Sequence, residues 1–223
     1  MNKQNFTLGF GLEKFFDLVV YFHRKKMYNI INPEINVNQF ESILDIGSTS
    51  DTGKSSNAFL HFFKANNIVS VSDQEITEQT KLNFPNVNFI LGDGLSLAFD
   101  DSSFDFVFSN AVLEHVGGMD NVIQFISESI RVASGRIIII TPNRWFPLET
   151  HTKLLFLHWL PPRIFRSILS KIGMGFFSKE ENLNLLTKTQ ITKIVKNLNP
   201  SSFKISYVRF MGYPSNIVVN INK

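Results

Sequence analysis

Residues 43–51 read Ile43-Leu44-Asp45-Ile46-Gly47-Ser48-Thr49-Ser50-Asp51, an apolar run that passes directly into a turn of small and polar residues. The apolar run predicts a buried β-strand, and the helical pattern beyond the turn predicts a strand, a turn and a helix in succession. Such a turn offers backbone N–H groups and the positive end of a helix to an anionic group. This stretch therefore predicts the first strand of an α/β sheet, with a ligand bound at its carboxyl end.

Beyond this stretch, short apolar runs alternate with segments of helical period. We expect strands at 42–46, 68–72, 87–91, 104–109 and 137–141, and helices at 54–64, 75–82 and 121–132. This alternation is typical of a parallel sheet with crossover helices. A helix around 187–197 follows, and then strands at 203–211 and 217–221. The short turn at 212–215 requires these last two strands to be antiparallel.

Two further segments lie outside the alternation. Apolar residues at helical spacing predict an amphipathic helix at about 12–30 that ends at Pro33, within an N-terminal helical segment 1–40. Residues 144–187 are rich in aromatic, leucine, histidine and basic residues, and Pro161-Pro162 separates two expected helices there. We interpret 144–187 as a helical cap inserted after the fifth strand.

Composition limits the classes of protein to which this chain of 223 residues can belong. It has no cysteine, which excludes disulfides, thiolate metal sites and a cysteine nucleophile, and we expect no bound metal. The net charge of +3 is small, so nucleic acid is not an expected partner. No apolar run approaches the roughly 20 residues of a membrane span, and no secretory leader is evident. We expect a cytoplasmic protein with a single domain, 1–223.

Two acidic residues follow later strands of the predicted sheet. Asp73 ends the second run, and Asp93 lies between Gly92 and Gly94 after the third. Open α/β sheets bind ligands at the carboxyl ends of their strands, and an acid roughly 20 residues after the first turn often binds ribose hydroxyls. Both carboxylates are therefore candidate ligand contacts.

Together with motifs further along the chain, these residues make 43–143 resemble the class I S-adenosylmethionine (SAM)-dependent methyltransferases of the type 11 group. The resemblance rests on the order and spacing of Leu44-Asp45-Ile46-Gly47, Asp73, Gly92-Asp93-Gly94, Phe104 to Asn110, Leu113-Glu114-His115-Val116, Glu128 with Arg131-Val132, and Thr141-Pro142-Asn143. It implies an α/β, Rossmann-like fold with a seven-stranded, mostly parallel sheet, an antiparallel C-terminal hairpin and helices on both faces. It also implies SAM as the cofactor and methyl transfer as the activity.

The resemblance further implies which residues contact SAM. Gly47 would admit the methionyl part with Asp45 bracing the turn, while Asp73 would bind the ribose hydroxyls and Asp93 the adenine amino group. The other implied contacts are Ser48, Thr49, Gly92, Gly94 and Asn110.

The turn departs from the family pattern Asp-x-Gly-x-Gly-x-Gly, because Thr49 and Asp51 occupy the later glycine positions. Side chains there crowd a tight turn. We therefore expect a longer turn that uses Gly53, with the hydroxyls of Ser48 and Thr49 holding the SAM carboxylate. A module that binds SAM without methyl transfer is the alternative.

A narrower resemblance covers residues 104–187 and points to a subgroup often associated with bacterial cell-surface glycan biosynthesis. It rests on Ser109 to Gly117, Thr141 to Glu149, His151-Thr152, His158 to Pro161 and Glu181 to Leu186. It implies a small-molecule acceptor or a sugar linked to a lipid or a nucleotide.

A hydroxyl acceptor must lose its proton during methyl transfer, so a base is needed. His115 is the preferred base, because an imidazole titrates near neutral pH and His115 follows the fourth strand. His151 and His158 are second candidates, and each histidine has a structural role as its alternative. Glu114 and Glu149 could orient a histidine or face solvent.

Three other functions fit the sequence less well. Gly53-Lys54-Ser55 is similar to the end of a phosphate-binding P-loop, but the first glycine of that motif would fall on Ser48. The Gly-x-Gly-x-x-Gly turn of nicotinamide dehydrogenases is absent. A nucleic-acid methyltransferase is disfavoured, because residues 109–112 lack the Pro-Pro-aromatic element that stacks a flipped base.

The cap carries the apolar run 154–160 beside the basic residues Lys153, Arg163, Arg166 and Lys171. We prefer to interpret this run as a lid over SAM. The alternative is peripheral association with anionic lipid at the inner membrane surface, or with a lipid-linked sugar. Trp145, Phe146 and Trp159 are candidates for lining an acceptor pocket.

Overall fold

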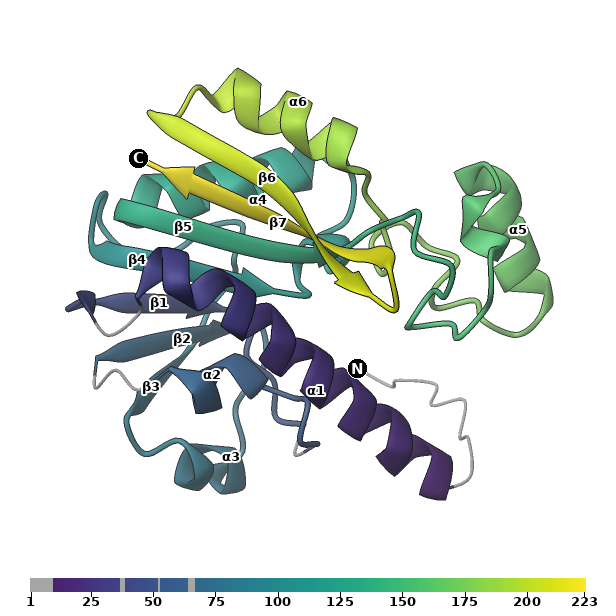
Figure 1. Ribbon diagram of the computed structural model, residues 1–223, viewed down its shortest axis with the longest axis horizontal. Helices are drawn as coiled ribbons and strands as arrows, with labels where there is room; N and C mark the ends of the chain where they lie inside the picture. Colours follow the sequence, from purple (N-terminus) through teal and green to yellow (C-terminus); the bar gives the residue numbers. More distant parts are fainter. Residues whose placement is uncertain (1–9, 37–38, 52, 64–66) are drawn as a thin grey trace.

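A computed structural model describes residues 10–36, 39–51, 53–63 and 67–223 (Figure 1). Its centre is a seven-stranded sheet in the order β3-β2-β1-β4-β5-β7-β6. The strands are β1 (Ile43–Ile46), β2 (Ile68–Ser72), β3 (Val87–Leu91), β4 (Phe104–Asn110), β5 (Ala133–Pro142), β6 (Ser202–Phe210) and β7 (Tyr213–Asn222). Strands β1 to β5 are parallel, whereas β7 is antiparallel to both β5 and β6. This sheet confirms the expected Rossmann-like class and its C-terminal hairpin.

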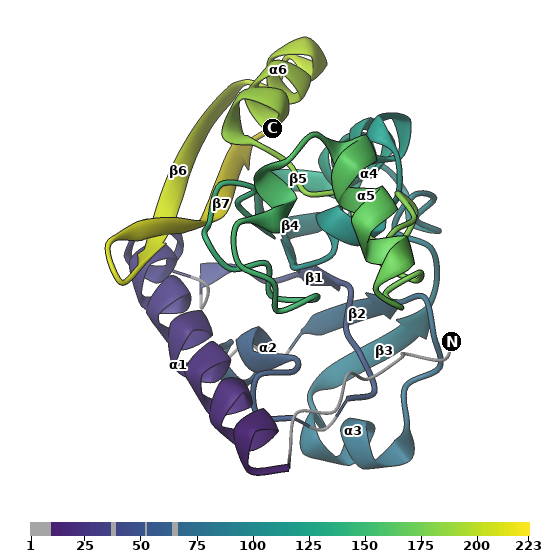
Figure 2. The same ribbon diagram turned by 90° about the vertical axis from the view of Figure 1, so that its right-hand side faces the viewer.

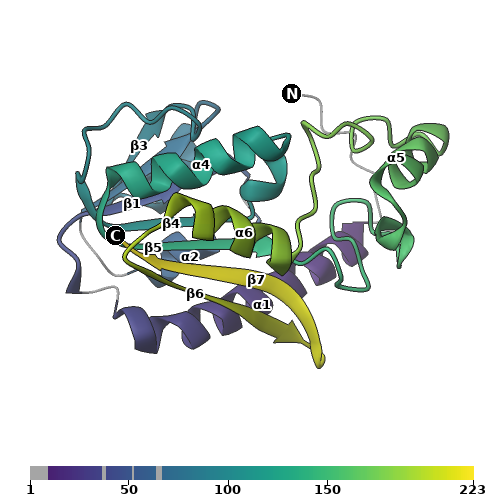
Figure 3. The ribbon, with the colours of Figure 1, turned by 90° about the horizontal axis from the view of Figure 1, so that it is seen from above.

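Helices cover both faces of the sheet, because its central strands are buried on both sides. One face is covered by α1 (Phe10–Ile35) and α2 (Ala58–Phe62), and the other by α4 (Met119–Val132) and α6 (Lys188–Leu198) (Figure 3). In β5, Ile138 and Ile140 belong to the core under α1 and α2, whereas Ile137 and Ile139 belong to the core under α4 and α6. Alternate side chains of one strand thus fill two separate cores.

The N-terminal helix is longer than its sequence predicts. It runs to Ile35, so the prediction that Pro33 ends it is wrong by two residues. Pro33 is tolerated because it lies in the last turn, where it removes a single hydrogen bond at the end of the helix. Parts of the expected segment 1–40, namely 1–9 and 37–38, lie outside the described residues.

The helix after β1 is shorter than the predicted 54–64, because a turn replaces its first half. Asn57 adopts a left-handed conformation with φ 52° directly before α2. Its side-chain carbonyl accepts the N–H of Thr49 at 3.0 Å, and its amide donates to the Thr49 carbonyl at 2.7 Å. The side chain of Asn57 therefore closes the turn. The helix α3 (Glu78–Asn83) likewise begins later than predicted, because Thr77 caps it.

The cap at 144–187 lies in front of the carboxyl edge of the sheet (Figure 2). It contains one α-helix, α5 (Pro162–Lys171), and the short 3-10 turn η3 (Leu157–Trp159), so the expectation of two helices is wrong. Pro162 begins α5, as proline at a first helical position can. The cap has a small core of its own, made of Phe165, Leu169, Leu183 and Leu185.

The C-terminal hairpin turns at Met211 and Gly212, which have φ of 48° and 86°. Two residues of positive φ form the kind of turn that matches the twist of a hairpin. The turn therefore precedes the predicted 212–215, and Tyr213 already pairs with Phe210. None of the helices in the described part of the chain has the length and apolar character to cross a membrane.

Candidate active site

Four parallel strands bring the predicted cofactor contacts to one edge of the sheet. Gly47 follows β1, Asp73 follows β2, Asp93 follows β3, and the half-buried Asn110 ends β4. Asp73 is exposed, and its carboxylate makes no hydrogen bond or ion pair with any described residue. Asp93 is also exposed, but its Oδ1 accepts the N–H of Leu95 at 2.8 Å. The carboxylate of Asp73 is thus open to a ligand, whereas that of Asp93 also closes its own turn.

Gly47 is required where β1 meets the loop after β4. It has φ of 105°, and a Cβ there would lie 2.0 Å from Val112 Cγ2. Ser48 follows it, and its Oγ is buried without a hydrogen-bond partner among the described residues. A buried hydroxyl without a partner is costly unless a ligand satisfies it. The turn therefore offers Ser48 Oγ to an anionic group.

The later part of the turn is closed by the chain itself. Thr49 Oγ1 accepts the N–H of Asp51 at 3.3 Å. The N–H groups of Lys54 and Ser55 both donate to the carboxylate of Asp17 on α1, at 2.9 Å each. Burial raises the pKa of Asp17, but these hydrogen bonds outweigh it and hold the pKa below its usual value. A carboxylate of the chain thus occupies the N–H groups that a P-loop would offer to phosphate.

Gly92 and Gly94 are explained by packing. A Cβ on Gly94 would lie 2.8 Å from the ring of Phe125 on α4, and one on Gly92 would lie 3.2 Å from Val71 Cγ1. Both glycines therefore let the turn after β3 approach its neighbours closely. This explanation does not require contact with a cofactor.

Asp45 is buried within the sheet, where it braces β1 against β2 rather than the turn. Its Oδ2 accepts the hydroxyl of Ser70, its partner in register, at 2.6 Å. Burial raises the pKa of Asp45 to about 6, because the hydrogen bond from Ser70 only partly offsets the loss of solvent.

We expect Asp45→Asn to stabilise the protein at pH 8 by ~1–3 kcal/mol in urea unfolding. The folded state holds a proton that the unfolded state loses between about pH 4 and the folded pKa of about 6, so stability falls over that range and stays low above it. The gain should therefore vanish below about pH 4. The exposed Asp100→Asn serves as the control, and an Asp45→Asn protein less stable than wild type at pH 8 would contradict this assignment.

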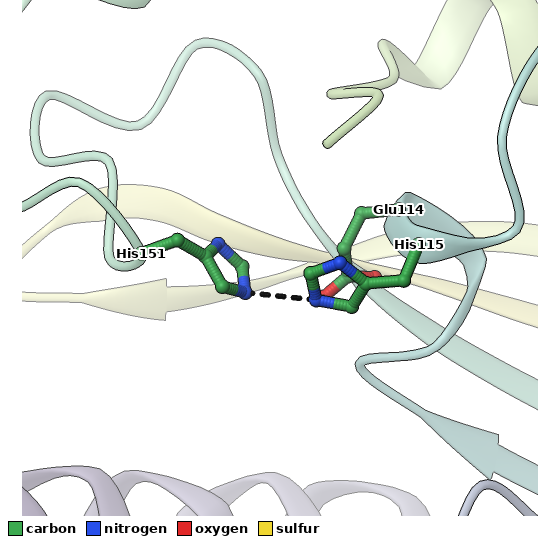
Figure 4. A group of neighbouring side chains, drawn as sticks. All are labelled: Glu114, His115 and His151. Atoms are coloured by element: carbon green, nitrogen blue, oxygen red, sulfur yellow. Dashed lines mark hydrogen bonds and ion pairs between the residues drawn. The ribbon is translucent and has the colours of Figure 1, made fainter. Parts of the chain in front are cut away.

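Next to the end of β4, four side chains from two loops meet: Glu114, His115, Glu149 and His151, which we call the histidine cluster. Glu114 and His115 lie on the 3-10 turn η2 (Leu113–His115), and Glu149 and His151 lie in the cap after β5. Figure 4 shows the two imidazoles with their Nε2 atoms facing each other, 3.0 Å apart. The structure therefore brings together four of the five side chains that the sequence offers for the proton transfer, and the fifth, His158, lies elsewhere.

The other nitrogen of each imidazole is held by an acceptor. His115 Nδ1 lies 2.8 Å from the backbone carbonyl of Asn182, and His151 Nδ1 lies 2.7 Å from Glu149 Oε1. A carbonyl and an ionised carboxylate can only accept, so both Nδ1 atoms carry hydrogen. The hydrogen bond between the two Nε2 atoms then requires one shared proton.

Glu149 fixes His151 through several contacts. Its carboxylate is buried and accepts the backbone N–H groups of His151 and Thr152 besides the imidazole. Burial raises the pKa of Glu149, but the bonds and charge of His151 outweigh it and lower the pKa to about 2. Burial lowers the pKa of His151, and Glu149 in turn raises it above the usual value. The carboxylate of Glu149 is therefore ionised, and it favours the protonated form of the His151 imidazole.

Glu114 is fully buried, and one of its oxygens lacks a partner. Oε2 accepts the hydroxyl of Thr141 at 3.0 Å, while Oε1 has no hydrogen bond within the described residues and lies 4.0 Å from His115 Nε2. Neither glutamate of the cluster faces solvent. Glu114, His115 and His151 each place a ligand atom within 4.8 Å of the others, so these three residues could hold a metal ion.

His158 lies apart from these contacts. It is buried, and its Nε2 lies 2.7 Å from the backbone carbonyl of Phe146. Burial lowers the pKa of His158, which suits a neutral imidazole in the core of the cap. These contacts favour the structural alternative for His158. Trp145 and Trp159 are both partly exposed, with ring centroids 6.4 Å apart.

Comparisons with known proteins agree with this fold. Residues 44–139 match the family model described as a methyltransferase domain. No curated protein sequence matches the chain.

Three solved structures illustrate the structural likeness. Magnesium protoporphyrin IX methyltransferase from Synechocystis PCC 6803 is 16% identical with a TM-score of 0.59, over 97% of this chain and 89% of that one. A SAM-dependent methyltransferase from Archaeoglobus fulgidus is 13% identical with a TM-score of 0.57, over 90% and 94%. The 1,6-didemethyltoxoflavin-N1-methyltransferase of Burkholderia thailandensis is 11% identical with a TM-score of 0.53, over 96% and 88%.

Identities this low establish the fold, and the family model matches only the part of the chain from residue 44 to residue 139. That part contains β1 to β4 with Gly47, Asp73, Asp93 and His115. Residues 44–139 therefore match a methyltransferase domain, within a chain whose seven-stranded sheet has the fold of solved SAM-dependent methyltransferases.

Proposed function

We propose that this chain transfers the methyl group of SAM to a hydroxyl oxygen of a small-molecule or glycan-linked acceptor. The histidine cluster carries this proposal. It presents His115, whose side chain is 38% exposed, beside the end of β4 and backs it with buried carboxylates. A partly exposed imidazole with such partners suits removal of a proton from an oxygen atom. Two of the similar structures are described as methyltransferases of small molecules, which supports the acceptor class.

The residues at the carboxyl edge fit SAM. Ser48 Oγ, which lacks a partner, suits the SAM carboxylate, and the open carboxylate of Asp73 suits the ribose hydroxyls. Asp93 retains one oxygen for the adenine amino group, and Asn110 lies at the same edge. SAM supplies an electrophilic methyl group on a positively charged sulfur. The chain aligns the acceptor oxygen and excludes water. The hydroxyl proton passes to Nε2 of the neutral His115 when this atom leaves its hydrogen bond with His151.

The function is tested by incubating the purified chain with SAM and cell extract. Mass spectrometry should reveal a product heavier by CH₂ that depends on both the protein and SAM, with S-adenosylhomocysteine formed in equal amount. Tight SAM binding without product in any extract would instead favour the binding-module alternative.

We expect Asp73→Ala to weaken SAM binding by about 10- to 100-fold, because a charge-assisted hydrogen bond contributes roughly 1.5–3 kcal/mol. Calorimetry on the purified protein measures this, with the exposed Asp100→Ala as the matched control. ATP with Mg²⁺ should bind far more weakly than SAM, since Asp17 occupies the N–H groups of residues 54 and 55. An unchanged SAM affinity would remove Asp73 from the site.

We further propose that the cap and α1 hold this site against an anionic lipid surface. Leu155 and Phe156 in the cap are 62% and 50% exposed, and Phe15 and Phe22 on α1 are 61% and 58% exposed. The ammonium group of Lys153 lies 5.9 Å from the ring centroid of Phe16, which joins the two segments. Side chains of a closed lid would be buried, so these exposures favour the lipid interface.

We expect the chain to sediment with anionic vesicles at low salt and less so at physiological salt. Arg163→Ala with Arg166→Ala should weaken this binding by roughly 30-fold, since each basic residue near such a surface contributes about 1 kcal/mol. Lys193→Ala with Lys196→Ala on α6 is the matched control. Absence of binding at low salt would leave the cap as a cover over a soluble acceptor.

A further inference from the structure

We propose that Glu114, His115 and His151 bind a divalent transition-metal ion, and that their ligand set suits Zn²⁺ best. Two imidazole nitrogens and one carboxylate with an open fourth position form the donor set of many catalytic zinc sites. The inference deepens the proposed function, because it specifies how the histidine cluster promotes loss of the hydroxyl proton. It changes one step of the proposed function. The two imidazoles bind the metal ion and do not take the proton, and the acceptor hydroxyl, bound to the ion, loses its proton to water.

The first argument is the orientation of the two imidazoles. Their Nδ1 atoms donate to the Asn182 carbonyl and the Glu149 carboxylate, so in the neutral form both lone pairs lie on Nε2. These two atoms face each other at 3.0 Å (Figure 4). Two lone pairs at this distance repel each other unless a proton or a cation lies beside both. Histidine ligands of metals almost always donate their other N–H to a carboxylate or carbonyl, as both do here.

The second argument is the oxygen of Glu114 that has no partner. The side chain is fully buried, Thr141 holds its Oε2, and its Oε1 faces the imidazoles at 4.0 Å from His115 Nε2. A proton shared between the imidazoles would leave Oε1 unsatisfied, whereas a cation would satisfy all three ligand atoms. Zinc bonds of about 2.0–2.1 Å in a tetrahedron separate ligand atoms by about 3.3 Å. The distance of 3.0 Å between the two Nε2 atoms is slightly shorter than that separation, and the 4.0 Å from His115 Nε2 to Glu114 Oε1 is slightly longer.

The third argument is charge and access. Glu114 and Glu149 contribute two negative charges, and Arg24 of α1 lies within electrostatic range of Glu114 and His151. The charges of Glu114, Glu149 and Arg24 sum to −1. A divalent ion with a deprotonated acceptor oxygen adds +1, so the total charge would be zero. His115 is partly exposed, so the fourth position of the ion is open to an acceptor. A hydroxyl oxygen is the ligand that suits this position.

Metal binding is tested without SAM or acceptor, on tag-free protein treated with a chelator and dialysed. We expect one Zn²⁺ per chain, bound with micromolar or tighter affinity in calorimetry, and a visible Co²⁺ spectrum of the tetrahedral type. His151→Ala and Glu114→Gln should each weaken Zn²⁺ binding at least 10-fold. His61→Ala on α2 is the matched histidine control and should bind like wild type. Because Glu114 is buried, circular dichroism checks that the Glu114→Gln protein is folded. His115→Ala provides a second test, because the side chain of His115 is partly exposed and its loss disturbs the fold less.

Absence of stoichiometric Zn²⁺ and Co²⁺ binding, or equal binding by wild type and His151→Ala, would overturn the metal site in favour of the shared proton. The proposed function is tested separately by the SAM-dependent product. Methyl transfer that persists in metal-free protein would reject the ion and keep His115 as the base. Zinc binding with no methyl transfer in any extract would reject the function and keep the ion.

Discussion

His115→Ala is expected to slow methyl transfer by at least about 10²-fold while SAM binding changes little, because the imidazole promotes loss of the hydroxyl proton either as the base or as a ligand of the proposed ion. The side chain stands between the buried Glu114 and the imidazole of His151, on the turn that follows β4. The proposed cofactor contacts lie at the strand ends and do not depend on this imidazole. Formation of S-adenosylhomocysteine in the presence of acceptor measures the rate, and calorimetry measures SAM binding.

The matched control is His61→Ala on α2, which removes a histidine that lies outside the cluster. The side chain of His115 is partly exposed, so we expect the His115→Ala protein to fold like wild type. An unchanged rate would remove His115 from the chemistry. A variant that fails to fold would support the structural role that the sequence leaves open for this histidine.

Most of the sheet can be predicted from the sequence, because each strand is a short apolar run beside a turn. The five parallel strands and the hairpin follow from runs such as 68–72 and 137–141, and strand position alone brings Asp73 and Asp93 to the same edge. The boundaries of α2 could not be predicted. They depend on two hydrogen bonds between Asn57 and Thr49, and on hydrogen bonds from the N–H groups of Lys54 and Ser55 to Asp17, which lies 37 and 38 positions earlier in the chain.

The candidate site could be predicted in its residue types but not in its pairing. Glu114 and His115 attract attention as a motif after the fourth strand, whereas His151 lies 36 residues after His115 and reaches it only through the path of the cap. Glu149 could equally face solvent by sequence, and its burial against His151 follows from the same path. No local pattern marks Asp17 or Arg24 on α1, because their partners come from distant loops.

The glycines show why position in a motif does not settle a role. Gly92 and Gly94 match a cofactor motif, yet contacts with Val71 and Phe125 account for the absence of a side chain. Phe125 lies on α4, far along the chain from Gly94, so this packing could not be predicted from the motif. Gly47 differs, because both its backbone conformation and its neighbour require glycine.

Gly47→Ala is expected to lower the free energy of unfolding by about 2–6 kcal/mol, a large share of the roughly 5–15 kcal/mol of an ordinary domain. A side chain at φ of 105° costs of order 1–3 kcal/mol in backbone strain. The new Cβ would lie 2.0 Å from Val112 Cγ2, and overpacking of this kind adds about 1–3 kcal/mol. Urea unfolding monitored by circular dichroism measures the sum.

Two further variants separate the causes of this loss. Gly175→Ala is the control, since a Cβ there meets nothing within 4 Å and its backbone is not at positive φ. Adding Val112→Ala to Gly47→Ala removes the contact but not the strain, so it should restore only part of the stability. Gly47→Ala with wild-type stability would show that the turn does not need glycine.

Glycine variants also distinguish the proposed SAM contact at the turn after β1 from packing elsewhere. Gly94→Ala should also destabilise the chain, because its Cβ would lie 2.8 Å from the ring of Phe125. At a temperature where all variants remain folded, Gly94→Ala should bind SAM nearly as wild type does. Gly47→Ala should bind SAM at least 10-fold more weakly. The new Cβ and Val112 must move apart, and this shifts the turn that carries Ser48 Oγ. Equal SAM affinities for the two variants would place the methionyl part of SAM away from this turn.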